Sequence, residues 1–226
     1  MNYDILHPGA FPIVKCDLAA GESLQAESDA MVSMSTTLDI KGTVSGGILG
    51  GLARKFLTGE SFFTQRITAA RGEGSVLLAP PTPGDVAAIP LDGSHGLRLQ
   101  KTSFLAATEG IEVQTKMQNL MKGFFSKEGF FVINVTGKGV LFVSSYGAIH
   151  PIVLEAGQEV IIDNGHLVAW DESMDYSIEK ASNGWISSIT SGECLVCRFK
   201  GPGTIHIQTR NPSGFFNWIR GAISAK

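Results

Sequence analysis

The chain alternates hydrophobic and acidic positions in the same way at three places. Residues 38–40, 111–113 and 174–176 each have the order apolar, acidic, apolar. Successive side chains of a β-strand point to opposite faces, so this order is typical of a strand with one buried side and one solvent-facing side. We therefore predict three strands with outward-facing acids, or, alternatively, acids that surround a shared axis. The acids are Asp39, Glu112 and Asp175.

Longer segments around these strands resemble one another. Residues 18–34 align without gaps with residues 154–170, and residues 97–107 align with residues 24–34. Self-similarity of this kind is the signature of a repeat architecture. Units of this size are marginally stable alone, so we expect three pseudo-symmetric repeats on one continuous core. The predicted repeats cover about residues 10–79, 80–150 and 151–211, followed by a short C-terminal helix at 213–226.

Turn-forming residues mark the expected strand ends. Asn164-Gly165 lies between two apolar runs, and this pair favours the positive φ angles of a two-residue hairpin turn. Glycines on both sides of one residue predict tight turns within 136–140 and 200–204. The proline-rich segment 80–84 is expected to be a rigid linker. Short helices are expected at 48–57, 117–125 and 215–224.

Composition favours a globular, mainly β protein. Of the 226 residues, 43% are hydrophobic and only 17% are charged, so the chain is too apolar to be a disordered tail. The 27 glycines are about twice the usual share, as expected for a chain with many tight turns. We predict a single compact domain that is mainly β, with a double-stranded β-helix or β-sandwich-like fold and a few short helices.

Charge and targeting signals limit the partners and the compartment. A net charge of -3 and a pI near 5.9 provide no overall attraction to nucleic acid or anionic membranes. The N-terminal residues lack the features of a secretory signal, and no window is apolar enough to form a membrane-spanning helix. Three cysteines without a framework spacing favour a reducing compartment. The sequence therefore predicts a cytoplasmic protein and argues against nucleic acid as a partner.

A family resemblance rests on a long glycine-rich connector and an early turn. The connector covers residues 42–63, with the run Gly-Gly-Ile-Leu-Gly-Gly-Leu at its centre, and the turn is Ala20-Gly21-Glu22. Together with the chain length, they resemble a bacterial family of uncharacterised proteins related to the altered inheritance of mitochondria protein 24, grouped structurally with the tryptophan RNA-binding attenuator protein. The resemblance implies a mostly β fold but no known reaction. It associates the mitochondrial relatives with inner-membrane organisation. The RNA-binding residues of the attenuator protein match no motif here.

The sequence supplies no assembled catalytic or metal-binding set. Cys194 and Cys197 form a C-x-x-C pair, but their surroundings predict a strand, on which residues three apart point to opposite faces. The five histidines are scattered, and no nucleophile-elbow motif is present. We expect the cysteines to serve in packing, and we assign no catalytic residue, no metal and no cofactor.

The connector itself is a candidate for packing or for contact. Its small-x-x-x-small spacings let a short helix or loop pack closely on the β core, and it lacks the lysine and hydroxyl of a phosphate-binding loop. Alternatively, it is a flexible, partly apolar segment that meets a partner or a membrane. The glycines concerned are Gly46, Gly47, Gly50 and Gly51.

The C-terminal segment carries hydrophobic side chains at helical spacing. Phe215, Trp218 and Ile219 form one stripe, with Phe216 beside it and Arg220 near its end. Docking on the protein's own core is the first interpretation. An interfacial helix or a subunit contact is the alternative.

Repetition without an assembled catalytic set favours a non-enzymatic scaffold or interaction protein. We expect a homo-oligomer that associates with a membrane or a protein partner. One alternative is a β-barrel that binds a small molecule or a metal. Another is RNA binding by analogy with the attenuator protein, which the acidic pI disfavours.

Overall fold

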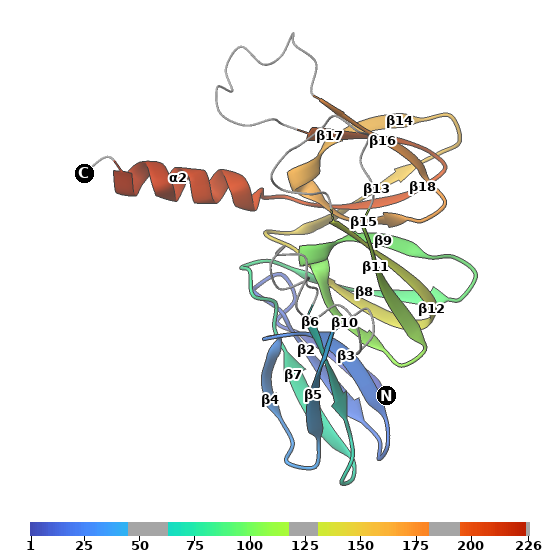
Figure 1. Ribbon diagram of the computed structural model, residues 1–226, viewed down its shortest axis with the longest axis vertical. Helices are drawn as coiled ribbons and strands as arrows, with labels where there is room; N and C mark the ends of the chain where they lie inside the picture. Colours follow the sequence, from blue (N-terminus) through green and yellow to red (C-terminus); the bar gives the residue numbers. More distant parts are fainter. Residues whose placement is uncertain (45–62, 118–130, 181–194, 225–226) are drawn as a thin grey trace.

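The computed structural model describes residues 1–44, 63–117, 131–180 and 195–224. These residues form antiparallel sheets in an elongated stack, and the helix α2 (Pro212–Ser224) projects from its side (Figure 1). The fold is mainly β and sandwich-like, as predicted. Within the described residues, no helix has the length and hydrophobicity needed to cross a membrane.

The first strands of the chain form two facing layers. They are β1 (Asn2–Leu6), β2 (Ile13–Leu18), β3 (Ser23–Glu27), β4 (Met31–Met34), β5 (Asp39–Val44), β6 (Phe63–Thr68) and β7 (Gly74–Leu78). One layer has the order β2-β7-β4, with β1 beside β2, and the other has the order β3-β6-β5. The layers face each other because their strands have one hydrophobic side. In β2, Val14, Cys16 and Leu18 alternate with Lys15 and Asp17 and point into the core.

The same arrangement recurs twice. The second group contains β8 (Val86–Asp92), β9 (Leu97–Gln100), β10 (Phe104–Thr108), β11 (Ile111–Met117) and β12 (Phe131–Ser144). The third contains β13 (Ile149–Leu154), β14 (Glu159–Asp163), β15 (Leu167–Asp171), β16 (Asp175–Lys180), β17 (Leu195–Lys200) and β18 (Gly203–Gln208).

Corresponding strands have corresponding partners in the three groups. The long strand β12 serves both layers of the second group: β9 and β11 pair with its first half, and β8 and β10 with its second half. In the third group the layers are β13-β18-β15 and β14-β17-β16. We interpret the groups as three repeats of one unit.

Two further strand pairs join the groups. Strand β3 pairs with β10, and β9 pairs with β15, which links strands of all three groups into one 11-stranded sheet. The hydrophobic cores also cross these junctions. Leu105 of β10 belongs to the core of the first group, and Val168 of β15 to the core of the second. Each group therefore completes the core of the group before it.

The hairpin predicted at Asn164-Gly165 is wrong. These residues lie in a 3-10 turn, η2 (Asn164–His166), and the flanking strands do not pair with each other, since β14 pairs with β17 and β15 with β9 and β18. The Asp163 carboxylate accepts a hydrogen bond from the Gly165 N–H at 2.7 Å. This local bond stabilises a turn that carries the chain from one layer to the other, so the two strands have distant partners.

The tight turn predicted within 136–140 is also wrong, because β12 continues through this segment. Gly137 has a φ of 104°, and a Cβ there would overlap the carbonyl oxygen of Gly110. Glycine thus permits a bend with close backbone approach, and one strand serves both layers. At 200–204 the predicted turn does separate β17 from β18.

The remaining local predictions concern two short helices and the proline-rich linker. The predicted helix at 48–57 lies outside the described residues. Of the predicted helix at 117–125, only Met117 is described, and it ends strand β11. The segment 80–84 connects β7 to β8, and the carbonyl of Pro83 accepts a hydrogen bond from the Gly147 N–H at 3.1 Å.

Candidate functional site

Helix α2 starts with a well-defined N-terminal cap. The Asn211 side-chain oxygen accepts a hydrogen bond from the Ser213 N–H at 2.9 Å, and Pro212 occupies the first helical position, where a missing N–H costs nothing. These features fix where the helix begins. Figure 1 shows that it extends away from the stack of sheets.

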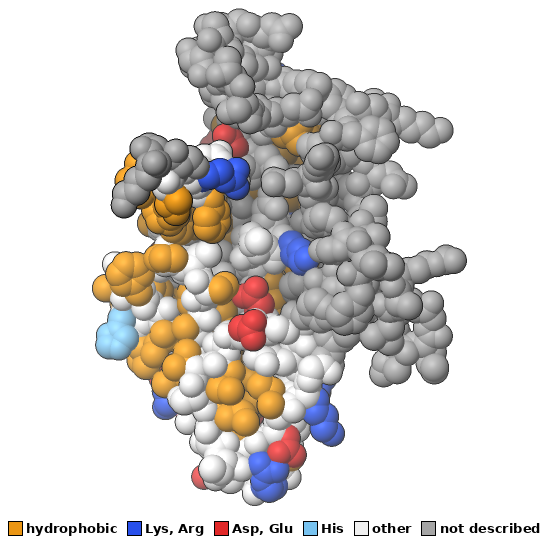
Figure 2. Space-filling view, turned by 60° about the vertical axis from the view of Figure 1, so that its left-hand side comes forward, with side chains coloured by type: hydrophobic (Ala, Val, Ile, Leu, Met, Phe, Trp, Pro, Cys, Tyr) orange, Lys and Arg blue, Asp and Glu red, His pale blue; other side chains and the backbone are white. Residues whose placement is uncertain are grey.

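The hydrophobic stripe of α2 is exposed, so the expected docking on the protein's own core is wrong. The exposed fractions are 42% for Phe215, 60% for Phe216, 69% for Trp218 and 70% for Ile223, and Ile219 is half-buried. Figure 2 shows several patches of hydrophobic side chains on the face from which α2 projects. Sequence periodicity found the stripe, but it could not show whether a sheet lay beneath it.

Contacts between aromatic rings lie near the start of α2. The ring centroid of Phe215 is 5.8 Å from that of Tyr146 on the body and 6.0 Å from that of Trp218 on the helix. Arg220 supplies the one charge on the described residues of the helix. The result is an aromatic, weakly basic surface that can bind an apolar partner.

The three predicted acids lie on corresponding strands and point away from the core. Asp39 is on β5, Glu112 on β11 and Asp175 on β16, each directly after a buried hydrophobic residue. Asp39 forms an ion pair with Arg71. Among the described residues, no hydrogen bond or ion pair joins any two of the acids, and each strand pairs within its own group. The structure does not bring these acids together.

Within the described residues, neither the cysteines nor the connector forms a reactive or metal-binding site. Burial raises the pKa of the Cys197 thiol to about 12, and that of Cys16 likewise, so both stay protonated at neutral pH. Cys194 and the connector glycines Gly46, Gly47, Gly50 and Gly51 lie outside the described residues. In the part of the chain that is described, no group of three histidine, cysteine or acidic residues could hold a metal ion.

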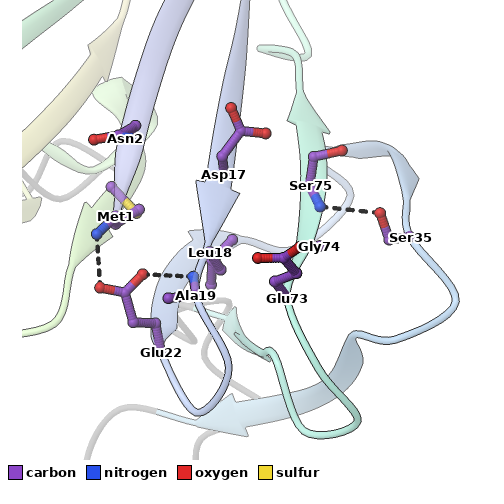
Figure 3. Close-up of a pocket in the computed structure, with 10 residues that line it drawn as sticks. All are labelled: Met1, Asn2, Asp17, Leu18, Ala19, Glu22, Ser35, Glu73, Gly74 and Ser75. Atoms are coloured by element: carbon purple, nitrogen blue, oxygen red, sulfur yellow. Dashed lines mark hydrogen bonds and ion pairs between the residues drawn. The ribbon is translucent and has the colours of Figure 1, made fainter.

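An open pocket of about 510 Å³ lies near the N-terminus (Figure 3). The N-terminal ammonium of Met1 donates to Glu22 Oε1 at 2.6 Å, and the Ala19 N–H donates to Oε2 at 2.8 Å. These two hydrogen bonds lower the pKa of Glu22. Asp17 and Glu73 also line the pocket, but no histidine or cysteine does among the described residues. The Glu22 carboxylate is therefore already bound by the chain's own donors, and the Asp17 carboxylate accepts a hydrogen bond from Lys15 Nζ at 2.9 Å.

Comparisons with known proteins relate the chain to a protein family and to a crystal structure. The sequence matches the family model described as "Mitochondrial biogenesis AIM24" over residues 3–210. The chain belongs to the AIM24 family. It is 35% identical over 227 residues to the uncharacterized protein M6_Spy0233 of Streptococcus pyogenes serotype M6, covering 97% of this chain and 90% of that protein. It also resembles the crystal structure of protein SPYM3_0169 from Streptococcus pyogenes, with a TM-score of 0.80, 32% identity and coverage of 98% and 99% of the two chains.

The exposed hydrophobic residues of this AIM24-family chain that the sequence did not predict include two on strands at the ends of sheets. Val32 on β4 is 58% exposed and Ile161 on β14 is 51% exposed. The sequence gives no signal of this exposure, because the alignment of the repeats equates Val32 with Leu105 and Val168, which are fully buried. Only the strand pairing shows that both exposed residues lie on strands at the ends of sheets.

Proposed function

We propose that this AIM24-family protein is a non-enzymatic scaffold that binds lipid membrane surfaces through helix α2. The observation that carries the proposal is the exposed aromatic stripe of α2 on a helix that projects from the β body. The sheets serve as a rigid support, and the helix makes the contact. The family description, mitochondrial biogenesis, and the inner-membrane association that the sequence resemblance implies are compatible with this role.

The distribution of side chains around α2 supports an orientation parallel to a membrane surface. Phe215, Trp218, Ile219 and Ile223 follow the spacing i, i+3, i+4, i+8 and share one side of the helix. Arg220 lies toward the opposite side. Interfacial helices combine Trp and Phe on the apolar face with basic residues on the polar face. A helix of this length does not span a bilayer, so it would lie at the interface.

A vesicle flotation assay on the full chain tests the proposal. We expect the wild-type protein to float with phosphatidylcholine vesicles and the emission of Trp218 to shift to shorter wavelength. In the double variant Phe216→Ser, Trp218→Ser, vesicle affinity should fall at least about tenfold, since each buried aromatic side chain contributes roughly 1.5–3 kcal/mol.

Asn217→Ala is the matched control, because Asn217 lies on the polar side of the same helix. It should bind vesicles like the wild type. A wild-type protein that stays at the bottom of the gradient overturns the membrane role. Equal flotation of the wild type and the double variant shows instead that another surface makes the contact.

A further inference from the structure

The two junctions between the groups have the same register. In the first, Ala26 of β3 lies opposite Ala106 of β10. In the second, Leu99 of β9 lies opposite Ala169 of β15. The repeat alignment places Ala26 with Leu99, and Ala106 with Ala169. One type of strand pairing thus joins group one to group two and group two to group three.

Each end of the stack presents one half of this pairing. Strand β14 corresponds to β3 and β9, and β4 corresponds to β10 and β15. In the described part of the chain, β14 pairs with β17 alone and β4 with β7 alone. Figure 1 shows β4 in the lower part of the stack and β14 at its upper end, so the two strands are far apart in one molecule.

At the register shift of β4, Val32 lacks, among the described residues, the covering strand that the corresponding residues of β10 and β15 have. The register of β4, β10 and β15 shifts at the same place, between the first and third residues of each strand. The residue at the shift is Val32, Leu105 or Val168. Leu105 and Val168 are 0% exposed because each lies in the core of the preceding group, whereas Val32 is 58% exposed.

Strand β14, at the other end of the stack, is also less buried than the corresponding strands β3 and β9. Leu24 of β3 and Leu97 of β9 are 1% and 4% exposed, but Val160 at the corresponding position is only half-buried. Beside it, Ile161 is 51% exposed. Natural edge strands are usually protected by lysine, proline or a covering segment. Strand β4, with the sequence Met-Val-Ser-Met, contains neither a charge nor a proline.

We propose that copies of this chain associate end to end, with β14 of one copy pairing with β4 of the next. The register of the internal junctions would place Ile162 opposite Ser33 and Ile161 opposite Met34. Val32 would then enter the core of the third group, as Val168 enters that of the second. The two surfaces differ, so the contact is head to tail and produces either a closed ring or a filament.

Single lysine variants on the two edges test this association. We expect the mass of the wild type in sedimentation velocity to rise with concentration above the 24.0 kDa of one chain. Val32→Lys and Val160→Lys should each remain monomeric, because each places a charge at a position that the internal junctions bury as Leu105 or Leu24. Val153→Lys is the control, because Val153 is 69% exposed on β13, away from both edges. It should assemble like the wild type.

Mixing the two edge variants gives the most specific outcome. Val32→Lys retains an intact β14, and Val160→Lys retains an intact β4, so the mixture should form dimers that grow no further. Cysteine pairing gives a second readout that does not depend on the lysine variants folding. Met34→Cys mixed with Ile161→Cys should form a disulfide-linked dimer, whereas Met34→Cys mixed with Val153→Cys should not.

The proposal is overturned by a wild type that stays monomeric throughout the micromolar range. Assembly that persists in both lysine variants, or absence of the specific cysteine cross-link, also overturns it. The aromatic variant of α2 should assemble normally, so failure of end-to-end pairing and failure of membrane binding are distinguishable.

Discussion

Val168→Ala and Val32→Ala remove the same two methyl groups from corresponding positions of two repeats. Val168 on β15 is 0% exposed and lies in the core of the second group. Val32 on β4 is 58% exposed. Both residues lie at a bulge in a short strand, so the difference in strand propensity between valine and alanine affects both variants similarly. Their comparison isolates the contribution of the junction between groups.

The expected magnitude follows from burial. Removing two buried methyl groups costs about 1.6 kcal/mol at about 0.8 kcal/mol each, and the cavity left behind raises the loss for Val168→Ala to about 2–3 kcal/mol. For a chain of this length, that loss corresponds to a fall in Tm of roughly 4–12 °C. Val32→Ala should change the free energy of unfolding by less than about 0.5 kcal/mol, because its side chain is largely in water.

Urea unfolding followed by circular dichroism measures both variants. The protein concentration must be low enough for single chains to predominate, since association would bury Val32. An equal loss of stability in the two variants, or a change of less than about 0.5 kcal/mol for Val168→Ala, would refute the idea that each group completes the core of the one before it.

Two further predictions concern buried charge and backbone geometry. Burial, with a smaller contribution from the charge of Asp29, raises the pKa of Glu27 from 4.5 to about 7. The folded state therefore binds the proton more tightly than the unfolded chain, and stability is full below about pH 4.5 and falls as the pH rises through about 7. Glu27→Gln should flatten this fall in urea titrations between pH 5 and 8, and an unchanged pH profile contradicts the assignment. Gly137→Ala should lose more than about 2 kcal/mol because of its positive φ and the nearby Gly110 carbonyl, whereas Gly157→Ala, with a positive φ in open space, should lose about 1 kcal/mol. Similar urea midpoints for the two glycine variants would show that close backbone approach is unimportant at Gly137.

The candidate surfaces were predictable only in part. Helical spacing identified Phe215 and Trp218, because residues three apart on a helix share a side. Their exposure depends on where the chain leaves β18, which local sequence does not encode. The edge residues Val32 and Ile161 look like ordinary strand residues in the sequence. They become candidates only when the pairing shows that no neighbouring strand covers them in the described structure.

By itself, the sequence determined the mainly β character of the chain and the inward and outward sides of its strands. These properties are local: alternation has the period of a strand, and residues such as Leu38 and Met174 are buried where the pattern requires. Tertiary structure decided which strands pair. Asn164-Gly165 suits a hairpin, yet β14 and β15 find partners in different layers, because pairing is selected by burial on both faces rather than by the turn alone. It also decided which corresponding positions are buried, since a residue at a repeat junction is covered only where another group follows or precedes it.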